Sequence, residues 1–409
     1  MRAPFLVLAA CVATVSSAAT PPPTARDIGS LLIPMDQGAE VFAPRVEGYM
    51  NGALENFPGF AVKKPEALFG MPVDEAATAA WKRAEKAWED GRQSFVANKY
   101  EDAERKLRSA IKAYGLAAAA MTACAHLCDA TAYYAAALHR RGDLEEAKIV
   151  LLDLLALQPN HEFSKDVFSQ SFLHFRGLSM RDVHASLRGS LTIRTRPAGA
   201  RVYLDGQLVG HTPFQSGALA MGKHWVRLER PGYRVRGEIV EVSPDEKSLS
   251  ADLVPTPLFR RYLATQRELG AEVLQPQVGP ALAATAKALG LNRVVLGTLK
   301  QLRNDGGNEL VLGLFDLRSG KRLADRKAVF QGDEFGQLGA EVERNVTALV
   351  NAGGFQREKV TKTRDPLDSS SGTDEWSGED RGGRGATHEA KTKRLGGDPL
   401  EGSSGTEDW

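Results

Sequence analysis

The spacing of the apolar residues changes abruptly near residue 189, and this change requires the chain to fold in at least two different ways. Between Val73 and about Asp182, alanine and leucine recur at helical intervals among charged residues, and the first proline is Pro159. Beyond Gly189, apolar and polar residues alternate between glycine and proline turns. Helical spacing predicts amphipathic helices, whereas alternation predicts strands. Since 409 residues are enough for about two to four domains, we predict a multidomain α+β protein.

The helical part, residues 73–185, contains two segments that share one packing pattern. Each combines a glycine with small and large residues at fixed intervals: Gly91, Tyr100, Ala103, Leu107 and Ala110 in residues 88–115, and Gly142, Ala147, Leu151 and Pro159 in residues 133–160. Both segments resemble tetratricopeptide (TPR) repeats, which implies a concave surface for a peptide or a partner helix. Ala103 and Ala147 are 44 residues apart, whereas that family repeats about every 34 residues. The alanine-rich stretch 116–127 is therefore predicted to lengthen a helix between the two segments.

Residues 189–254 carry the most specific motif of the chain. The stretch contains Pro197-Ala198-Gly199-Ala200, then VYLDG at residues 202–206, and later GKHWV at residues 222–226. It resembles the PEGA domain, with Ala198 in place of the glutamate that gives the family its name. The resemblance implies a small antiparallel β-module and a role in interactions at the cell envelope. Asp205-Gly206 predicts a hairpin turn, because glycine accepts a positive φ without steric cost.

The last folded part is predicted to be an α/β unit over residues 258–354. A small-residue helix at 278–289 ends at Gly290, a strand follows at 292–302, a hairpin turns at 318–321, and a helix covers 335–352. Residues 20–72 have the pattern of a strand, a helix and a second strand from residue 60 to 68. A unit this small buries too little apolar surface to be stable alone. We therefore predict that residues 28–70 complete the sheet begun by residues 278–352.

The N-terminus has the pattern of a secretory signal peptide over residues 1–19. A single arginine precedes an apolar run, and small residues follow it. The run is too short to span a bilayer, which takes about 20 apolar residues. An alternative is a lipoprotein signal, in which Cys11 would be lipidated. Both predict an exported chain in the periplasm or the outer cell envelope, without a transmembrane segment in its mature form.

The two other cysteines, Cys124 and Cys128, are four residues apart in a stretch predicted to be helical. A disulfide within one helical turn would be strained, so we predict two buried free thiols. His126 between them lies on another face of that helix. The three side chains therefore do not predict a metal site.

No pattern of catalytic residues occurs in the chain. The sequence has no phosphate-binding glycine loop, no GxSxG and no HExxH motif. His224 falls where the PEGA resemblance expects a histidine and is predicted to pack beside Trp225. Asp205 is predicted to be a turn residue rather than a catalytic acid. The acidic groups Glu101-Asp102-Glu104 and Glu145-Glu146 are predicted to be solvated. We therefore predict no catalytic, cofactor-binding or metal-binding residue and no cofactor. A net charge of +1 gives no reason to expect a nucleic acid partner.

The C-terminal segment 355–409 has few apolar residues and is predicted to be disordered, because it cannot offset the entropy of ordering. It contains one peptide twice, DPLDSSSGTDEW at residues 365–376 and DPLEGSSGTEDW at residues 398–409. We predict that Leu367, Trp376, Leu400 and Trp409 contact a partner, since tryptophan is favoured at binding hot spots. A neutral duplication without function is the alternative.

Together these patterns predict a non-enzymatic adaptor or scaffold. It would be exported and would mediate protein–protein interactions within an assembly of the bacterial cell envelope. The alternative is a structural protein that binds cell-wall polymer or a surface layer through residues 189–254. A third hypothesis, an enzyme in the α/β unit, would require a deep polar pocket where several acids or histidines converge.

Overall fold

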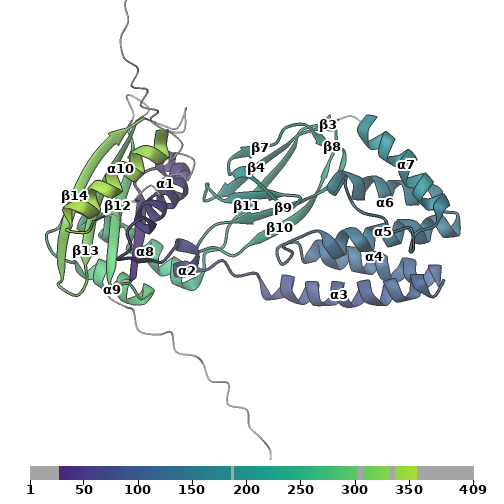
Figure 1. The fold of residues 1–409 in the computed structure, drawn as a ribbon, viewed down its shortest axis with the longest axis horizontal. Helices are drawn as coiled ribbons and strands as arrows, with labels where there is room; N and C mark the ends of the chain where they lie inside the picture. Colours follow the sequence, from purple (N-terminus) through teal and green to yellow (C-terminus); the bar gives the residue numbers. More distant parts are fainter. Residues whose placement is uncertain (1–26, 186–187, 303–306, 332–336, 357–409) are drawn as a thin grey trace, which may run out of the picture. The chain divides into compact units, whose positions relative to one another are not determined.

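The computed structural model describes residues 27–185, 188–302, 307–331 and 337–356, and the statements below concern these residues (Figure 1). The described residues all belong to one compact unit of the chain. The predicted signal peptide with Cys11 and the predicted disordered segment lie outside the described residues, apart from residues 355 and 356. Among the described residues, no helix is long and apolar enough to cross a membrane.

Two distant segments of the chain build one five-stranded sheet. Its strands are β1 (Asp27–Pro34), β2 (Ala61–Val62), β12 (Arg293–Gln301), β13 (Asn308–Asp316) and β14 (Lys321–Phe330), in the order β14-β13-β12-β1-β2. Strand β1 runs parallel to β12, from Ile28 opposite Arg293 to Pro34 opposite Leu299. The prediction that residues 28–70 complete the sheet of residues 278–352 is therefore confirmed.

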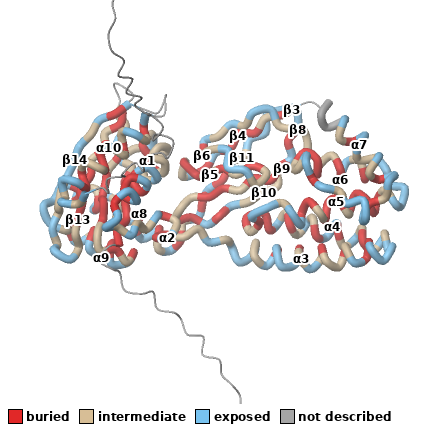
Figure 2. Tube along the Cα trace, in the orientation of Figure 1, coloured by how far each residue is buried: buried red, intermediate tan, exposed pale blue. Residues whose placement is uncertain are grey.

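Helices cover both faces of this sheet. Helices α1 (Gln37–Glu55) and α10 (Gln337–Ala352) pack on one face, against Ile28 and Leu32 of β1. Helices α8 (Pro257–Glu272) and α9 (Pro280–Leu289) pack on the other, against Leu31 and Ile33. Figure 2 shows the resulting buried layer along the strands. A strand covered on both faces needs apolar side chains without alternation, which explains the run LLIP in β1.

Two elements of this part differ from the prediction. Residues 60–68 were predicted to be extended, but only β2 is, and α2 (Pro65–Phe69) follows it. Pro65 stands in the first turn of α2, where proline is well tolerated. Helix α8 was not predicted, although Thr256 caps it by accepting a hydrogen bond from the Phe259 amide, with Pro257 in its first turn.

The predicted helical part contains five helices among the described residues: α3 (Glu75–Val96), α4 (Tyr100–Leu116), α5 (Ala125–Arg141), α6 (Leu144–Leu157) and α7 (Gln170–Ala185). Helices α3 and α4 approach closely at Gly91, where an added Cβ would lie 2.7 Å from Cγ of Leu107. Ala103 and Ala147 are fully buried, and Gly142 ends α5 with a φ of 91°. The small residues of the predicted pattern therefore lie at helix contacts.

The prediction that residues 116–127 lengthen a helix is wrong. Helix α4 ends at Leu116 and α5 begins at Ala125. The carbonyl of Ala118 in the intervening turn accepts a hydrogen bond from Nε1 of Trp225 over 2.9 Å. A Cβ on Gly237 would lie only 2.2 Å from the Ala118 carbonyl carbon. The alanine-rich stretch forms a corner because small side chains let the backbone contact the neighbouring β-module directly.

The prediction of two free thiols is also wrong, because Cys124 and Cys128 form a disulfide. Cys124 occupies the N-cap position of α5, before the first helical turn is complete. Their Cα atoms are 5.5 Å apart, a separation common among disulfides. The pair therefore joins the entry of α5 to its first turn.

Residues 188–252 form the β-module. Its strands are β3 (Arg188–Gly189), β4 (Leu191–Arg196), β5 (Arg201–Leu204), β6 (Gln207–His211), β7 (Phe214–Gln215), β8 (Leu219–Ala220), β9 (Gly222–Glu229), β10 (Arg236–Val242) and β11 (Lys247–Asp252). They pair in the orders β10-β9-β5-β6, β11-β4-β7 and β3-β8. All pairs are antiparallel, as predicted, except that β11 runs parallel to β4.

The predicted hairpin turn joins β5 and β6. Asp205 and Gly206 have φ angles of 52° and 83°, which suit the twist of a two-residue hairpin. Val202 and Val226 from one sheet share a core with Leu191 and Ile193 from the other. The two larger sheets therefore pack against each other.

Candidate functional site

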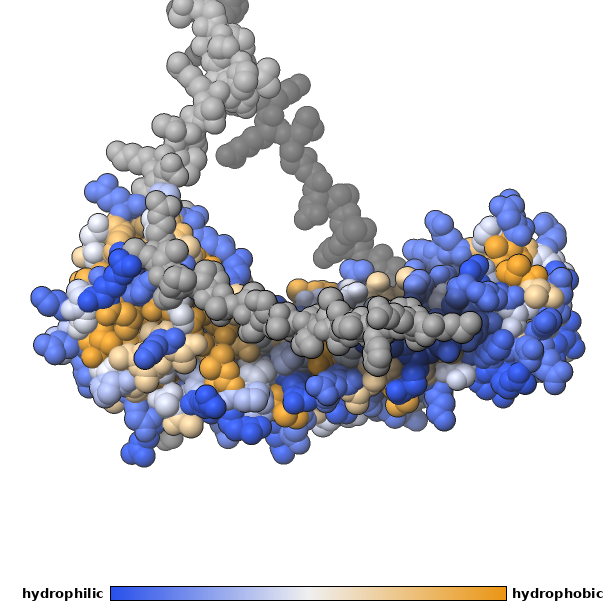
Figure 3. Space-filling view, turned by 90° about the horizontal axis from the view of Figure 1, so that it is seen from below, coloured by the Kyte–Doolittle hydropathy of each residue, from blue (hydrophilic) through white to orange (hydrophobic). Residues whose placement is uncertain are grey.

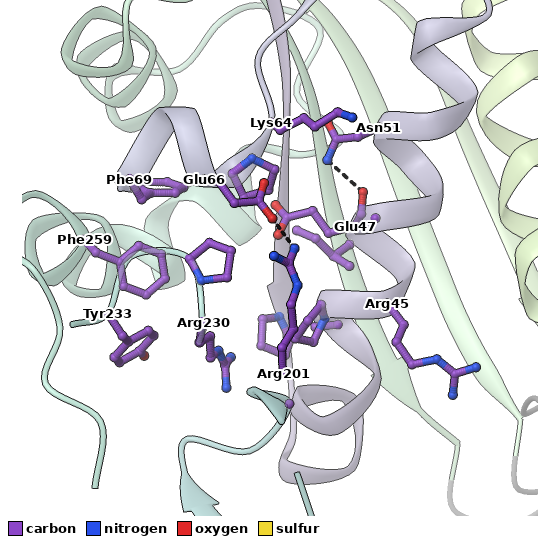
Figure 4. Close-up of a pocket in the computed structure, with 18 of the residues that line it drawn as sticks. Arg45, Glu47, Asn51, Lys64, Glu66, Phe69, Arg201, Arg230, Tyr233 and Phe259 are labelled. Atoms are coloured by element: carbon purple, nitrogen blue, oxygen red, sulfur yellow. Dashed lines mark hydrogen bonds and ion pairs between the residues drawn. The ribbon is translucent and has the colours of Figure 1, made fainter. Parts of the chain in front are cut away.

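A cavity of about 590 Å³ lies where the β-module meets α1, α2 and α8 (Figure 4). The polar side chains that line it come from both sides of this contact: Glu40, Arg45, Glu47, Asn51, Glu55, Lys64, Glu66, Arg201, His211, Arg230 and Gln266. They are far apart in the sequence. The fold, rather than a local motif, brings them together.

Ion pairs connect the walls of this cavity. Arg201 of β5 binds Glu66 of α2 through a charge-assisted hydrogen bond. Lys64 and Glu55 pair over 2.8 Å at an exposed position. Arg230 of the β-module lies 4.0 Å from Glu40 of α1. Opposite charges thus face each other across the cavity, which favours a fixed contact between the β-module and the α/β part.

Glu47 is the unusual carboxyl of the cavity. It projects from α1 toward Arg201 and Glu66 in Figure 4. Burial raises its pKa to about 8, although the backbone of Leu32 and the charge of Arg230 oppose this shift. A carboxyl with such a pKa is protonated at neutral pH. Glu47 therefore presents a neutral hydrogen-bond donor to the cavity.

Aromatic rings form the apolar side of the cavity. The ring centroids of Phe69 and Phe259 are 4.8 Å apart, and those of Tyr233 and Phe259 are 5.1 Å apart. Burial raises the pKa of Tyr262, which stays a neutral phenol. These rings contact one another, so they close the cavity rather than offering free faces.

The chemistry available in this cavity is that of a polar binding site. Glu47 can donate a proton or a hydrogen bond, and the guanidinium groups can hold an anion. Among the described residues that line the cavity, none is serine, threonine or cysteine. Burial and two nearby arginines lower the pKa of His211. These groups permit the binding of a polar ligand.

His224 and Asp205 form a buried pair inside the β-module. Nδ1 of His224 lies 2.7 Å from Oδ2 of Asp205, and Nε2 lies 2.9 Å from the carbonyl oxygen of Ala220. Oδ1 of Asp205 accepts from the Trp225 amide over 2.8 Å. Burial lowers the pKa of His224, but the hydrogen bond and charge of Asp205, the hydrogen bond to the Ala220 carbonyl and the charge of Asp153 together raise it, and the net direction is upward. The predicted roles of both residues, packing and turn formation, agree with these contacts.

The β-module also has an open sheet edge. Strand β6 is the last strand of its sheet. Leu208 and Val209 on it are 56% and 39% exposed. An edge strand keeps unpaired backbone groups that can bind an extended segment of another chain.

The other predicted residues are distributed as follows. Leu367, Trp376, Leu400 and Trp409 lie outside the described residues. Within the described ranges no group of histidine, cysteine and acidic residues could hold a metal ion.

Of the acids predicted to be solvated, Glu104 is instead largely buried and pairs with Arg108 and Arg141. Sequence reasoning missed it because Arg141 lies on another helix.

Comparison with known families identifies the β-module. Residues 188–256 match the family model described as PEGA domain. No curated protein matches the chain. The match covers every strand from β3 to β11, including the turn at Asp205 and the buried His224. Residues 188–256 are therefore a PEGA domain.

Proposed function

We propose that this protein is a non-enzymatic adaptor that is exported to the bacterial cell envelope and holds other proteins together there. The PEGA domain is consistent with a protein-interaction role in a surface or secreted protein. The disulfide Cys124–Cys128 supports export, because disulfides persist mainly in oxidising compartments.

The open β6 edge is the observation that carries this proposal. Two sides of the PEGA domain are already occupied within the chain. Trp225 binds the corner at Ala118, and Arg201 binds Glu66. Strand β6 keeps a free edge with two exposed apolar side chains, Leu208 and Val209. A partner segment that pairs with β6 would gain backbone hydrogen bonds and cover apolar surface.

The repeated peptides at residues 365–376 and 398–409 are part of the same proposal. Each offers one leucine and one tryptophan, Leu367 with Trp376 and Leu400 with Trp409. Two copies of a weak motif raise the effective affinity through local concentration. The adaptor would then have two kinds of contact, a sheet edge and linear motifs.

The proposal is tested by recovering partners from bacterial envelope extracts with the wild-type chain and three altered forms of it. The β6 variant carries Leu208→Asp and Val209→Asp, and a second form lacks residues 355–409. The control carries Ile149→Asp, since Ile149 is 62% exposed on α6. We expect the β6 variant to lose at least one partner that the wild type and the control retain.

Equal recovery by the β6 variant and the control would refute the role of the edge. Equal recovery without residues 355–409 would remove the repeated peptides from the proposal. Sedimentation with purified peptidoglycan separates the alternative function. Co-sedimentation of the full chain that is lost with the β6 substitutions would favour a wall-binding structural protein.

A further inference from the structure

An apolar cavity of about 280 Å³ lies where α4, α5 and α6 meet strands β9 and β10 of the PEGA domain. Most of its lining is hydrocarbon, from Ile111, Leu127, Val150, Leu154, Leu157 and Ile239. Leu127 and Leu154 are buried, whereas Ile111 and Val150 are partly exposed, so the cavity extends from the helical core to the surface. It shares no lining residue with the cavity around Glu47, and it is separate from the β6 edge.

Gly115 keeps one wall of this cavity free of a side chain. It lies in the last turn of α4, and an added Cβ would point into open space. Glycine is unfavourable within a helix, and no close contact requires it here. The consequence of Gly115 is that the cavity stays open.

The polar side chains that line the cavity already have partners within the chain. The Thr131 hydroxyl donates to the carbonyl of Leu127 over 2.7 Å, and the Tyr134 hydroxyl donates to Glu146 over 2.6 Å. Both ring nitrogens of His224 are engaged inside the PEGA domain. A polar group of a ligand that entered this region would lose its hydrogen bonds to water without replacement, which is unfavourable. The part of a ligand that fills the cavity must therefore be hydrocarbon.

The mouth of the cavity carries a positive charge. Lys223 of β9 and Asp153 of α6 compensate each other over 2.8 Å. Lys112 of α4 is exposed and has no ion pair or hydrogen bond with any residue that the structure describes. A lysine ammonium group binds a carboxylate or a phosphate as a point charge. The ligand should therefore combine a hydrocarbon part with an anionic group.

The volume of the cavity sets the size of the hydrocarbon part. Since a cavity of about 150 Å³ holds the carbons of benzene, 280 Å³ holds about ten carbons at the same density. Leucine and phenylalanine side chains of a partner protein are smaller, and a tryptophan would bring an N–H group that finds no free acceptor inside. A single alkyl chain fits the cavity best.

We propose that this cavity binds one alkyl chain of about ten carbons with an anionic head group on Lys112, as in a medium-chain fatty acid or a lipid with one acyl chain. This inference goes beyond the adaptor function, since it names a small ligand rather than a partner protein. The bound chain would contact the helices and the PEGA domain at once, through Leu154 of α6 and Ile239 of β10.

The test is isothermal titration calorimetry of the full chain with decanoate as the probe, with all ligands below their micelle concentrations. Decanol supplies the alkyl chain without the charge, and acetate supplies the carboxylate without the chain. Hexanoate, octanoate and tetradecanoate vary the chain length. Decanoyl lysophosphatidylglycerol distinguishes a lipid source of the chain from a free fatty acid.

Two variants with matched controls locate the binding. Gly115→Phe fills the cavity, and its control is Gly177→Phe, because Gly177 of α7 is also a helical glycine whose added Cβ would point into open space. Lys112→Met removes the charge at the mouth, and its control is Lys82→Met on an exposed position of α3. Circular dichroism and urea midpoints establish that each variant is folded. Lys112→Met alters only a surface side chain, so the test remains valid if Gly115→Phe does not fold.

We expect saturable binding of one decanoate per chain and no binding of acetate. The affinity should rise about fourfold with each methylene from hexanoate to decanoate and then level off, because further carbons stay in water. Gly115→Phe should weaken the binding of decanoate at least tenfold. Lys112→Met should weaken it about threefold and leave the binding of decanol unchanged. Whichever of decanoate and decanoyl lysophosphatidylglycerol binds more tightly identifies the source of the chain, and both outcomes support the site.

Absence of saturable binding to the folded wild type, or equal affinity of the Gly115→Phe variant and its control, would overturn the inference. An affinity that keeps rising at the same rate up to tetradecanoate would also overturn it, since this would indicate adsorption to the protein surface. Equal affinity of the Lys112→Met variant and its control for decanoate would refute the role of the anionic head group.

Discussion

Replacing Glu47 with glutamine should stabilise the protein at neutral and alkaline pH, although the side chain lines a cavity full of charges. Glutamine has the shape and the donor capacity of the protonated acid that burial favours. The folded-state pKa of Glu47 is about 8, raised from 4.5. Between these two values the unfolded chain releases a proton that the folded chain keeps. Stability therefore falls as pH rises through this window, by about 1.4 kcal/mol per pH unit.

The magnitude follows from the two pKa values. At pH 7, which is 2.5 units above the unfolded-state pKa of 4.5, the loss in free energy of unfolding is about 3 kcal/mol. Above pH 8 the full shift corresponds to a loss of about 5 kcal/mol. The Glu47→Gln variant should gain these amounts relative to the wild type and lose nothing near pH 4.5. Urea unfolding at several pH values between 5 and 9, followed by tryptophan fluorescence and circular dichroism, measures the difference.

The matched control is Glu55→Gln, at another residue that lines the same cavity. Glu55 is 47% exposed and pairs with Lys64, so its substitution should leave the pH dependence of the wild type unchanged. A constant difference between the Glu47→Gln variant and the wild type across this pH range would refute the reasoning. It would mean that Glu47 is ionised in the folded protein and that the cavity stabilises its charge.

The remaining predictions concern the PEGA domain and its contact with the helices. Trp225→Phe removes the hydrogen bond to the Ala118 carbonyl and should lower the free energy of unfolding by about 1–3 kcal/mol, measured by urea unfolding. Gly237→Val should prevent contact with the corner at Ala118, and limited proteolysis should then cut that corner, whereas Gly217→Val in open space should not. Cys124→Ser removes the disulfide and should lower the free energy of unfolding by about 2 kcal/mol under oxidising conditions, because the bond closes a loop of only a few residues. With a reductant present, the variant and the wild type should be equally stable. Asp205 stabilises protonated His224, so this contribution is fully present below pH 6.5 and is lost as pH rises through the raised pKa; His224→Gln should abolish that dependence.

The periodic elements could be predicted from the sequence because their signals are local. The run LLIP in β1 is apolar without alternation, as a strand covered on both faces requires. The Asp205-Gly206 turn needs positive φ at both residues, and glycine supplies the second at no steric cost. Helix α8 could also have been predicted, because Thr256 and Pro257 are favoured residues at a helix start. These features depend on neighbouring residues alone.

The features that failed or were missed depend on contacts between distant residues. Alanine favours helix, yet residues 117–120 form a turn because the carbonyl of Ala118 binds Trp225, 107 residues further along the chain. The cavity places Glu66 opposite Arg201, which is 135 residues away. Glu47 gave no signal, since one acid on a helix surface is ordinary. Its raised pKa arises from its burial in the folded protein.

The path of the chain explains why these distant contacts occur together. The helical part and the PEGA domain are inserted between the two halves of one α/β sheet, after α2 and before α8. The departing and the returning segments bind the same short loop of the PEGA domain. The Gly232 amide donates to the carbonyl of Gly70 over 2.8 Å, and the Thr256 amide donates to the carbonyl of Gly232 over 2.8 Å. A force on the PEGA domain is therefore transmitted through one loop to both segments that connect it with the sheet, the one after α2 and the one before α8. A partner bound at β6, as proposed above, would be connected to the α/β part through the PEGA domain that binds it.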